Sequence, residues 1–150
     1  MKHSLFTLLL LFAFSLSAKG QKPAYQIYQG NGKAINYHKL LKKAKKADII
    51  LFGELHDNPI NHWLQLELSQ DLMSDQLIMG AEMMEADNQV VIDEYLMGWI
   101  SSKKLIAESK TWPNFTTDYL PLMELAQSSD IPFIATNIPR RYASIVYSHG

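Results

Sequence analysis

Residues 48–58 read DIILFGELHDN, and this stretch decides how the chain is interpreted. Its apolar run at 48–52 is typical of a buried strand, and the motif Gly53-Glu54-Leu55-His56 follows directly. If the extended geometry continues, Glu54 and His56 share one face while Leu55 points into the packing. Such a pair has the chemistry to bind a metal or to relay a proton. The structural alternative is that Glu54 caps backbone amides and His56 is satisfied in a turn.

A helix start follows the motif. Asp57 or Asn58 is a suitable N-cap, and Pro59 suits the first helical position, where its missing N–H is no loss. The motif therefore sits on a strand-to-helix turn. Open α/β sheets usually bind ligands at such turns, beyond the carboxyl ends of parallel strands.

The rest of the chain alternates apolar runs with helical patterns, which predicts an α/β fold. A three-layer arrangement is expected, with helices flanking parallel strands. The turn signal Gly30-Asn31-Gly32 predicts a β-hairpin before this pattern begins. The parallel strands are predicted at about 48–53, 77–83 and 131–136. Helices are predicted at about 37–46, 59–73, 88–99, 101–109 and 118–128, with a last helix that ends near 148.

Polar residues lie near the carboxyl end of each predicted strand. Parallel pairing brings these ends to one edge of the sheet, so the polar side chains are expected to converge there. Neighbours on a helix point about 100° apart, so only one of the two adjacent arginines after the third strand is expected to face the site. Arg140 is favoured because it follows the strand end more directly. The residues concerned are Glu54, His56, Glu82, Asn137, Arg140 and Arg141.

Residues 1–20 have the pattern of a cleaved signal peptide. Lys2 and His3 precede an apolar run at 5–16 that is too short to span a membrane, and Ala18-Lys19-Gly20 offers a small-x-small cleavage site. We therefore expect an exported protein, periplasmic or otherwise extracytoplasmic, with a mature domain at 21–150. The chain has no cysteine, so disulfides and thiolate metal sites are excluded and a lipoprotein is not expected.

The charge balance gives no sign of nucleic-acid binding. Lysine and arginine total 14 against 15 acidic residues, for a formal net charge of −1. The Lys-rich segment 39–46 is explained as the solvated face of a helix. The chain also has no Gly-x-Ser-x-Gly elbow and no glycine-rich phosphate loop, which argues against nucleophilic triads and phosphate binding.

The ordered motifs resemble the ChaN family of haem-binding uptake proteins. They keep their order and spacing over almost all of 21–150. The superfamily also holds Tiki-type metalloproteases and erythromycin-esterase-like hydrolases. Family members are usually longer, so the chain is expected to represent the N-terminal portion without the family's C-terminal part. The segments that carry the resemblance are 51–58, His62 with Gln65, 80–83, 87–89 with 95–96, Trp112 with 118–122, 131–132 and 137–140.

The resemblance implies an extracytoplasmic protein that binds haem for iron or haem uptake, and a binding protein rather than an enzyme. Haem asks for an axial donor, an apolar slot and cations for its propionates. Expected partners are haem, a second copy of the chain, and an outer-membrane receptor or transport system. For Tyr119 ordinary packing is the alternative, and for His62 simple exposure. The candidate haem-binding residues are Tyr119, Tyr142 and His62 for the iron, Trp112 for the slot, Arg140 for a propionate, and Asn137.

Two alternatives stay open. In the first, the chain is a metal-dependent hydrolase of peptide or ester bonds. A divalent ion held by His56, Glu54 and Glu82 would lower the pKa of a bound water, and a glutamate would act as general base. In the second, the chain is an incomplete fragment that binds nothing.

Overall fold

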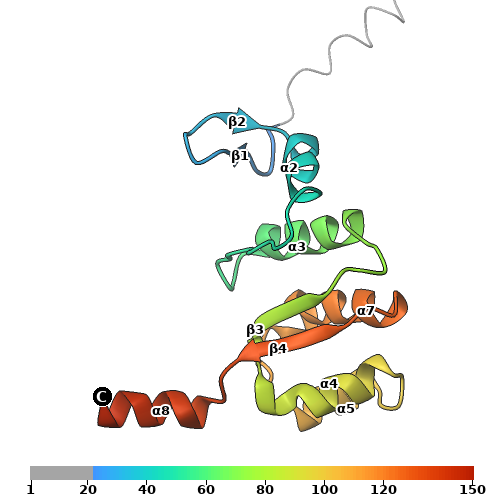
Figure 1. Cartoon of the computed structure of the whole chain (residues 1–150), viewed down its shortest axis with the longest axis vertical. Helices are drawn as coiled ribbons and strands as arrows, with labels where there is room; N and C mark the ends of the chain where they lie inside the picture. The colour runs from blue at the N-terminus through green and yellow to red at the C-terminus, as the bar shows by residue number, and fades with distance from the viewer. Residues whose placement is uncertain (1–21) are drawn as a thin grey trace, which may run out of the picture. The chain divides into compact units, whose positions relative to one another are not determined.

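The computed structural model describes residues 22–150, so the predicted signal peptide lies outside the described residues. The chain divides after Asn36 into two compact units. Figure 1 shows the order of the helices and strands. Among the described residues, no helix combines the length and the apolar character that crossing a bilayer requires.

The first unit contains the predicted β-hairpin. Strands β1 (Ile27–Tyr28) and β2 (Ala34–Ile35) pair in antiparallel fashion. The turn between them is closed by the amide of Gly32, which donates to the carbonyl oxygen of Gln29 at 2.8 Å. Gly32 has a φ of 79°, a left-handed conformation that glycine adopts without steric cost. The turn predicted from the sequence is confirmed.

The second unit is built on two parallel strands. Strands β3 (Met79–Glu85) and β4 (Phe133–Asn137) pair in parallel, with Met79 opposite Phe133. The parallel pairing and the flanking helices confirm the predicted α/β class. The helices are α2 (Tyr37–Ala44), α3 (Pro59–Asp71), the 3-10 turn η1 (Ala86–Asn88), α4 (Gln89–Leu96), α5 (Ser102–Glu108), α6 (Phe115–Asp118), α7 (Leu120–Ser128) and α8 (Arg140–His149).

The first predicted strand is absent. Residues 48–53 form no ladder, and the side chains of Ile49 and Leu51 are 79% and 93% exposed. An apolar run becomes a strand only when a neighbour takes up its backbone N–H and C=O groups. In the described part of the chain the parallel sheet contains β3 and β4 alone, so this run pairs with neither strand. The Gly53-Glu54-Leu55-His56 motif consequently lies on a loop.

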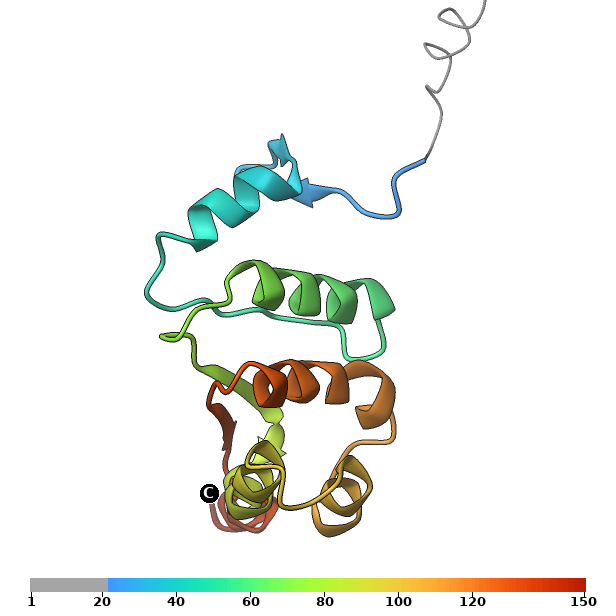
Figure 2. The same cartoon turned by 90° about the vertical axis from the view of Figure 1, so that its right-hand side faces the viewer.

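The hydrophobic core lies on one face of the β3–β4 sheet. Burial alternates along the strands: Ala81 and Phe133 are buried, whereas Glu82 and Ile134 on the opposite face are exposed. In the three-layer arrangement expected from the sequence, helices would also cover the face of the sheet that carries Glu82 and Ile134. Helix α4 packs against β4 and α7, and α3 packs against α7 (Figure 2). The buried core residues are Met79, Ala81, Met84, Ile92, Tyr95, Leu105, Phe115, Tyr119, Leu120, Leu122, Met123, Ala126, Ile131, Phe133 and Ala135.

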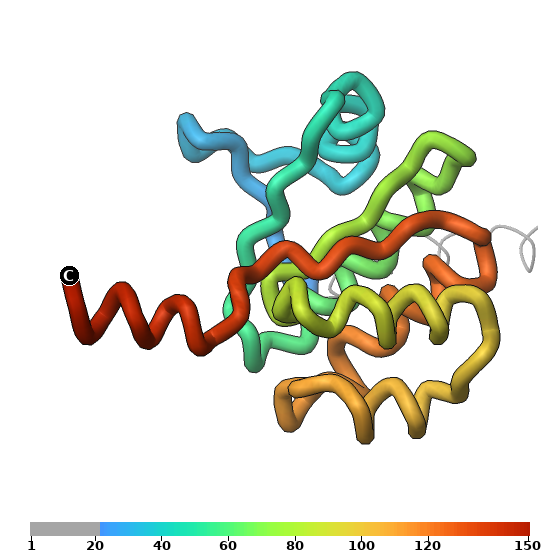
Figure 3. The backbone as a smooth tube through the Cα atoms, turned by 60° about the horizontal axis from the view of Figure 1, so that its bottom comes forward, coloured from blue at the N-terminus to red at the C-terminus, as the bar shows by residue number. Residues whose placement is uncertain are grey.

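Helix α8 continues from the carboxyl end of β4 (Figure 3). Every residue of this helix is exposed. Its first turn is attached through Arg141, whose guanidinium pairs with Asp87, and through the amide of Arg140, which donates to Glu85 Oε2 at 3.0 Å. The attachment of α8 therefore lies at its amino end.

Candidate functional site

The loop that carries the motif is fixed by the start of α3. Asn58 is the N-cap, as predicted: its Oδ1 accepts hydrogen bonds from the amides of Ile60 at 2.9 Å and Asn61 at 3.2 Å. Pro59 stands in the first helical turn. The cap holds residues 54–57 at the amino end of α3.

Glu54 is the centre of a buried polar cluster, and its side chain is 5% exposed. The Tyr119 hydroxyl donates to its Oε1 at 2.6 Å, and Gln65 Nε2 donates to its Oε2. His56 Nδ1 lies 3.0 Å from Oε1. Burial alone raises the pKa of the Glu54 carboxyl, but these three hydrogen bonds outweigh burial and bring its pKa below the ordinary value. Glu54 is therefore an ionised carboxylate at neutral pH.

Tyr119 reaches Glu54 from 65 residues further along the chain. It stands between α6 and α7 and is 2% exposed. Burial and the hydrogen bond to Glu54 both raise the pKa of the Tyr119 phenol. The hydroxyl considered above as an iron ligand thus stays protonated and donates to Glu54.

His62, on α3, is surrounded by four oxygen atoms. Its Nδ1 lies 3.3 Å from Gln65 Oε1 and 3.5 Å from Glu54 Oε2. Its Nε2 lies 3.0 Å from the carbonyl oxygen of His56 and 3.5 Å from Asp118 Oδ2. The residue is 6% exposed, which rules out the alternative of an exposed His62.

His56 is the more open histidine of the cluster, with a side chain that is 52% exposed. Its ring meets Trp112 edge to face, with ring centroids 4.7 Å apart, and its carbonyl oxygen accepts from Asn114 Nδ2 at 2.8 Å. Its Nδ1 faces Glu54, and its Nε2 has no hydrogen-bond partner among the described residues. The term Glu54 cluster is used below for Glu54, His56, His62, Gln65, Asp118 and Tyr119.

An open pocket of about 660 Å³ lies at the carboxyl ends of β3 and β4. Three residues singled out in the sequence, Trp112, Asn137 and Arg140, line it together. Trp112 also touches His56, so this pocket adjoins the Glu54 cluster. The other lining residues are Met83, Glu85, Lys110, Ile138, Ala143, Ser144, Tyr147 and Ser148.

Two basic side chains line the pocket, and they differ in their ion pairs. Lys110 Nζ lies 3.6 Å from Glu85 Oε2 and 3.7 Å from Asp87 Oδ2. The guanidinium of Arg140 forms no ion pair within residues 22–150, whereas the neighbouring Arg141 pairs with Asp87. The aromatic ring of Trp112 therefore lines the same pocket as the guanidinium of Arg140, which is not engaged in an ion pair with the described residues.

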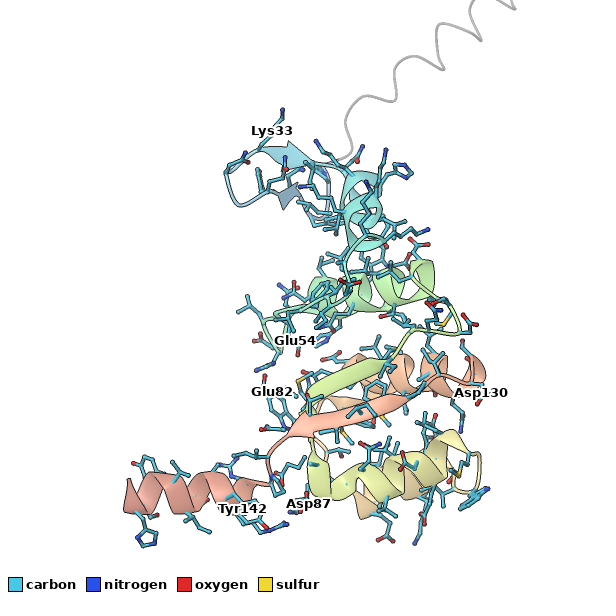
Figure 4. All side chains as sticks on the ribbon, viewed as in Figure 1. Lys33, Glu54, Glu82, Asp87, Asp130 and Tyr142 are labelled. Atoms are coloured by element: carbon cyan, nitrogen blue, oxygen red, sulfur yellow. The ribbon has the colours of Figure 1, made fainter. Side chains whose placement is uncertain are left out.

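Two of the sequence candidates form no hydrogen bond, ion pair or ring contact with these groups in the described part of the chain. Glu82 is exposed on β3, and within residues 22–150 it forms no hydrogen bond or ion pair with Glu54 or His56. Figure 4 labels both glutamates. Tyr142 is 51% exposed, with the guanidinium carbon of Arg141 4.8 Å from its ring centroid. In residues 22–150 no group of three His, Cys, Asp or Glu side chains is arranged to hold a metal ion. The predicted metal set is therefore not assembled.

Reasoning from the sequence assigned no role to Gln65, Asn114 or Asp118. Gln65 follows His62 by three positions on α3, a spacing that puts both on one helix face. Asn114 Nδ2 donates to Asp118 Oδ2 at 2.7 Å and so links this carboxylate to the motif loop. The helical spacing could have identified Gln65, but no local signal points to Asn114.

Comparison with known proteins gives one family model and one solved structure that are similar to the chain. The family model described as "Haem-binding uptake, Tiki superfamily, ChaN" matches residues 40–150. A solved structure, "Cofacial heme binding to ChaN of Campylobacter jejuni", is similar with a TM-score of 0.66 and 21% identity, over 84% of this chain and 53% of that one. The chain thus spans about half the length of that relative, and the likeness concerns the fold. No curated protein matches the chain.

Proposed function

Because the chain belongs to the ChaN family of haem-binding uptake proteins, we propose that it binds haem and serves haem or iron uptake. The observation that carries the proposal is the open pocket beside Trp112 at the ends of β3 and β4. A haem site needs apolar surface for the macrocycle, cations for the propionates and a donor for the iron. The pocket offers all three.

The residues of the pocket suit both the apolar macrocycle and the charged propionates of a haem. A volume of about 660 Å³ lies within the range of roughly 300–1,000 Å³ that is usual for ligand pockets. Trp112, Met83 and Ile138 supply apolar surface. Arg140 can meet a propionate with two parallel N–H donors, and it would not have to give up a carboxylate to do so.

Tyr147 is the pocket residue best suited to the iron. It is 93% exposed and carries a phenolic oxygen, a donor that haem iron accepts. Tyr119 and His62 are engaged within the Glu54 cluster, and Tyr142 is not part of the pocket wall. When bound, haem supplies the iron centre, and the chain holds the macrocycle and the propionates.

Export and partners extend the same proposal. The pattern of residues 1–20 supports export to a periplasmic or other extracytoplasmic space. A second copy of the chain and an outer-membrane receptor or transport system are proposed as partners on the family resemblance. Haem itself is the partner that the pocket supports.

Hydrolysis is a second candidate, favoured by the Glu54–His56 pair. Glu54 accepts from His56 Nδ1–H, which leaves Nε2 as a half-exposed base. This nitrogen would take a proton from water as the water oxygen attacks an ester or amide carbonyl. The resulting tetrahedral adduct would then break its bond to the alcohol or amine, which leaves with the proton returned from Nε2. The divalent-metal version lacks its ligand set, because no group of three His, Cys, Asp or Glu side chains in residues 22–150 is arranged to hold a metal ion. His56→Ala should abolish turnover of an activated ester and leave haem affinity within about twofold if the two functions are separate.

A haem titration followed at the Soret band tests the main proposal. Arg140→Gln should weaken binding about tenfold, because a charge-assisted hydrogen bond contributes about 1.5 kcal/mol. Arg141→Gln is the matched control, since this neighbouring arginine pairs with Asp87 and does not line the pocket. A folded wild-type chain that gives no saturable shift would contradict haem binding. Equal losses in both variants would contradict the assignment of the pocket.

A further inference from the structure

One face of α2 and of the turn that follows it is made of lysines. The helical hydrogen bonding continues beyond Ala44: the amide of Lys45 donates to the carbonyl oxygen of Leu41 at 2.9 Å, and the amide of Lys46 donates to that of Lys43 at 3.1 Å. The spacing i, i+3, i+4, i+7 therefore puts four exposed lysines on one side. The term lysine face is used below for Lys39, Lys42, Lys43 and Lys46.

The other face of α2 is the one that is partly covered. Leu40, Leu41 and Ala44 are half-buried, whereas the lysines are exposed. The Tyr37 hydroxyl donates to Asp71 Oδ2 at 2.9 Å, which joins the start of α2 to the end of α3. The helix is thus held through its apolar side, and the lysine face is left open to a partner.

The charges of the lysine face are not balanced within the segment. Residues 37–46 contain no Asp or Glu, and Lys42 and Lys46 form no ion pair with any group in residues 22–150. Like charges four residues apart destabilise a helix, and Lys39 with Lys43 forms a second such pair beside Lys42 with Lys46. A face that served solubility alone would be more stable with charges of both signs. An anionic surface laid against the helix would relieve this repulsion.

The rest of the chain has the opposite charge. Residues 39–46 hold five of the 14 lysines and arginines, which leaves nine against 15 acidic residues, a formal balance of −6. A negatively charged surface therefore attracts this segment and repels the remainder of the chain on average. The charge distribution favours one orientation, with the lysine face toward the anions.

We propose that the lysine face docks on the surface of a bilayer that contains anionic phospholipids. Such a surface offers many anionic headgroups, and each lysine close to it adds attraction without a fixed contact geometry. A protein partner matches the face less well, because protein–protein interfaces are enriched in arginine and depleted in lysine. A single-stranded nucleic acid matches it less well too, since the face has no aromatic side chain on which bases could stack. The inference goes beyond haem binding and does not depend on it.

Co-sedimentation of the full chain with lipid vesicles tests the proposal. Vesicles of equal parts phosphatidylglycerol and phosphatidylcholine should bind the chain at least tenfold more tightly than vesicles of phosphatidylcholine alone. Salt screens exposed charges, so this preference should disappear between about 0.05 M and about 0.5 M salt. Equal binding to both kinds of vesicle at low salt would overturn the proposal.

Matched variants locate the contact. Lys42→Gln combined with Lys46→Gln removes two charges from the lysine face and keeps residues of similar helix propensity. Each lysine near an anionic surface contributes about fivefold in affinity, so the double variant should bind about 25-fold more weakly. Lys103→Gln combined with Lys104→Gln removes the same charge from exposed positions on α5 and should change the affinity less than about threefold. The apolar run at 5–16 is present in both variants, so any contribution it makes cancels in the comparison.

Equal losses in the two double variants would show that net charge, rather than the lysine face, governs binding, and would overturn the proposal. Polyaspartate that binds the chain as tightly as the anionic vesicles do would point to an acidic protein and overturn the choice of lipid. None of the four substituted lysines lines the pocket, so both variants should bind haem as the wild type does. Failure of the haem titration would therefore leave the vesicle result standing, and the reverse also holds.

Discussion

The Tyr119 hydroxyl offers a sharp test of what holds the Glu54 cluster together. Tyr119→Phe keeps the ring in the core, against His62 and Phe115, and removes only the donor that lies 2.6 Å from Glu54 Oε1. A hydrogen bond to a charged acceptor contributes about 1.5–3 kcal/mol. Glu54 is buried, so water does not replace the lost donor freely. We expect the free energy of unfolding at pH 7 to fall by about 2 kcal/mol, which raises the unfolded fraction roughly thirtyfold.

The same substitution should change the dependence of stability on pH. The pKa of Glu54 is lowered in the folded chain, so its stabilising contribution is present above the ordinary value of 4.5 and is lost as the pH falls through the folded value. Without the Tyr119 donor the folded pKa moves upward and this contribution shrinks. The stability gap between wild type and variant should therefore narrow as the pH falls.

Urea unfolding followed by tryptophan fluorescence, at pH 7 and at about pH 3.5, measures both effects. Tyr147→Phe is the control, because its hydroxyl lies on a side chain that is 93% exposed and its loss should change stability by less than about 0.5 kcal/mol. Equal unfolding of the two variants at pH 7 would contradict a stabilising hydrogen bond from Tyr119 to Glu54. A gap between wild type and Tyr119→Phe that stays constant between the two pH values would contradict the lowered pKa of Glu54 as its source.

Three further predictions concern stability and use the same urea assay. Asn58→Ala removes the side-chain cap of α3 and should cost about 1 kcal/mol, and an unchanged midpoint would contradict the cap. Gly80→Ala places a methyl group 2.9 Å from Thr136 Cγ2 and should cost about 1–3 kcal/mol; adding Thr136→Ser removes that contact and should restore most of the loss. Leu105→Ala, at a fully buried position, should cost about 2–5 kcal/mol, and a loss below 1 kcal/mol would show that α5 is not part of the core.

Local sequence patterns predicted the elements that depend on local chemistry. The cap at Asn58 and the hairpin turn at Gly32 follow from side-chain and backbone preferences that the sequence carries, and both are found. The runs that became β3 and β4 were also identified, to within a few residues. The run at 48–53 shows the limit of this reasoning, because its composition is right for a strand but the existence of a partner strand is a tertiary fact.

The same distinction between local and tertiary contacts applies to the candidate site. The nearness of Glu54 and His56 is local, and the pattern predicted it, although the pair lies on a loop rather than a strand. The bond from Tyr119 to Glu54 spans 65 residues and follows from the packing of α6 and α7, which no periodicity encodes. Glu82 follows the buried Ala81, and the alternation of a strand turns it to the exposed face of the sheet.

The attachment of α8 at its amino end makes the shape of the pocket depend on the local folding of one helix. Five lining residues, from Arg140 to Ser148, belong to α8, and none of the side chains of this helix is buried. Such a segment opens easily, so part of the interaction energy of any ligand goes into ordering it. Amide hydrogen exchange at 143–149 should slow on binding far more than exchange in the core helix α7. Slower amide exchange in α8 would then report ligand binding through the protein backbone, without any use of the absorbance of the ligand.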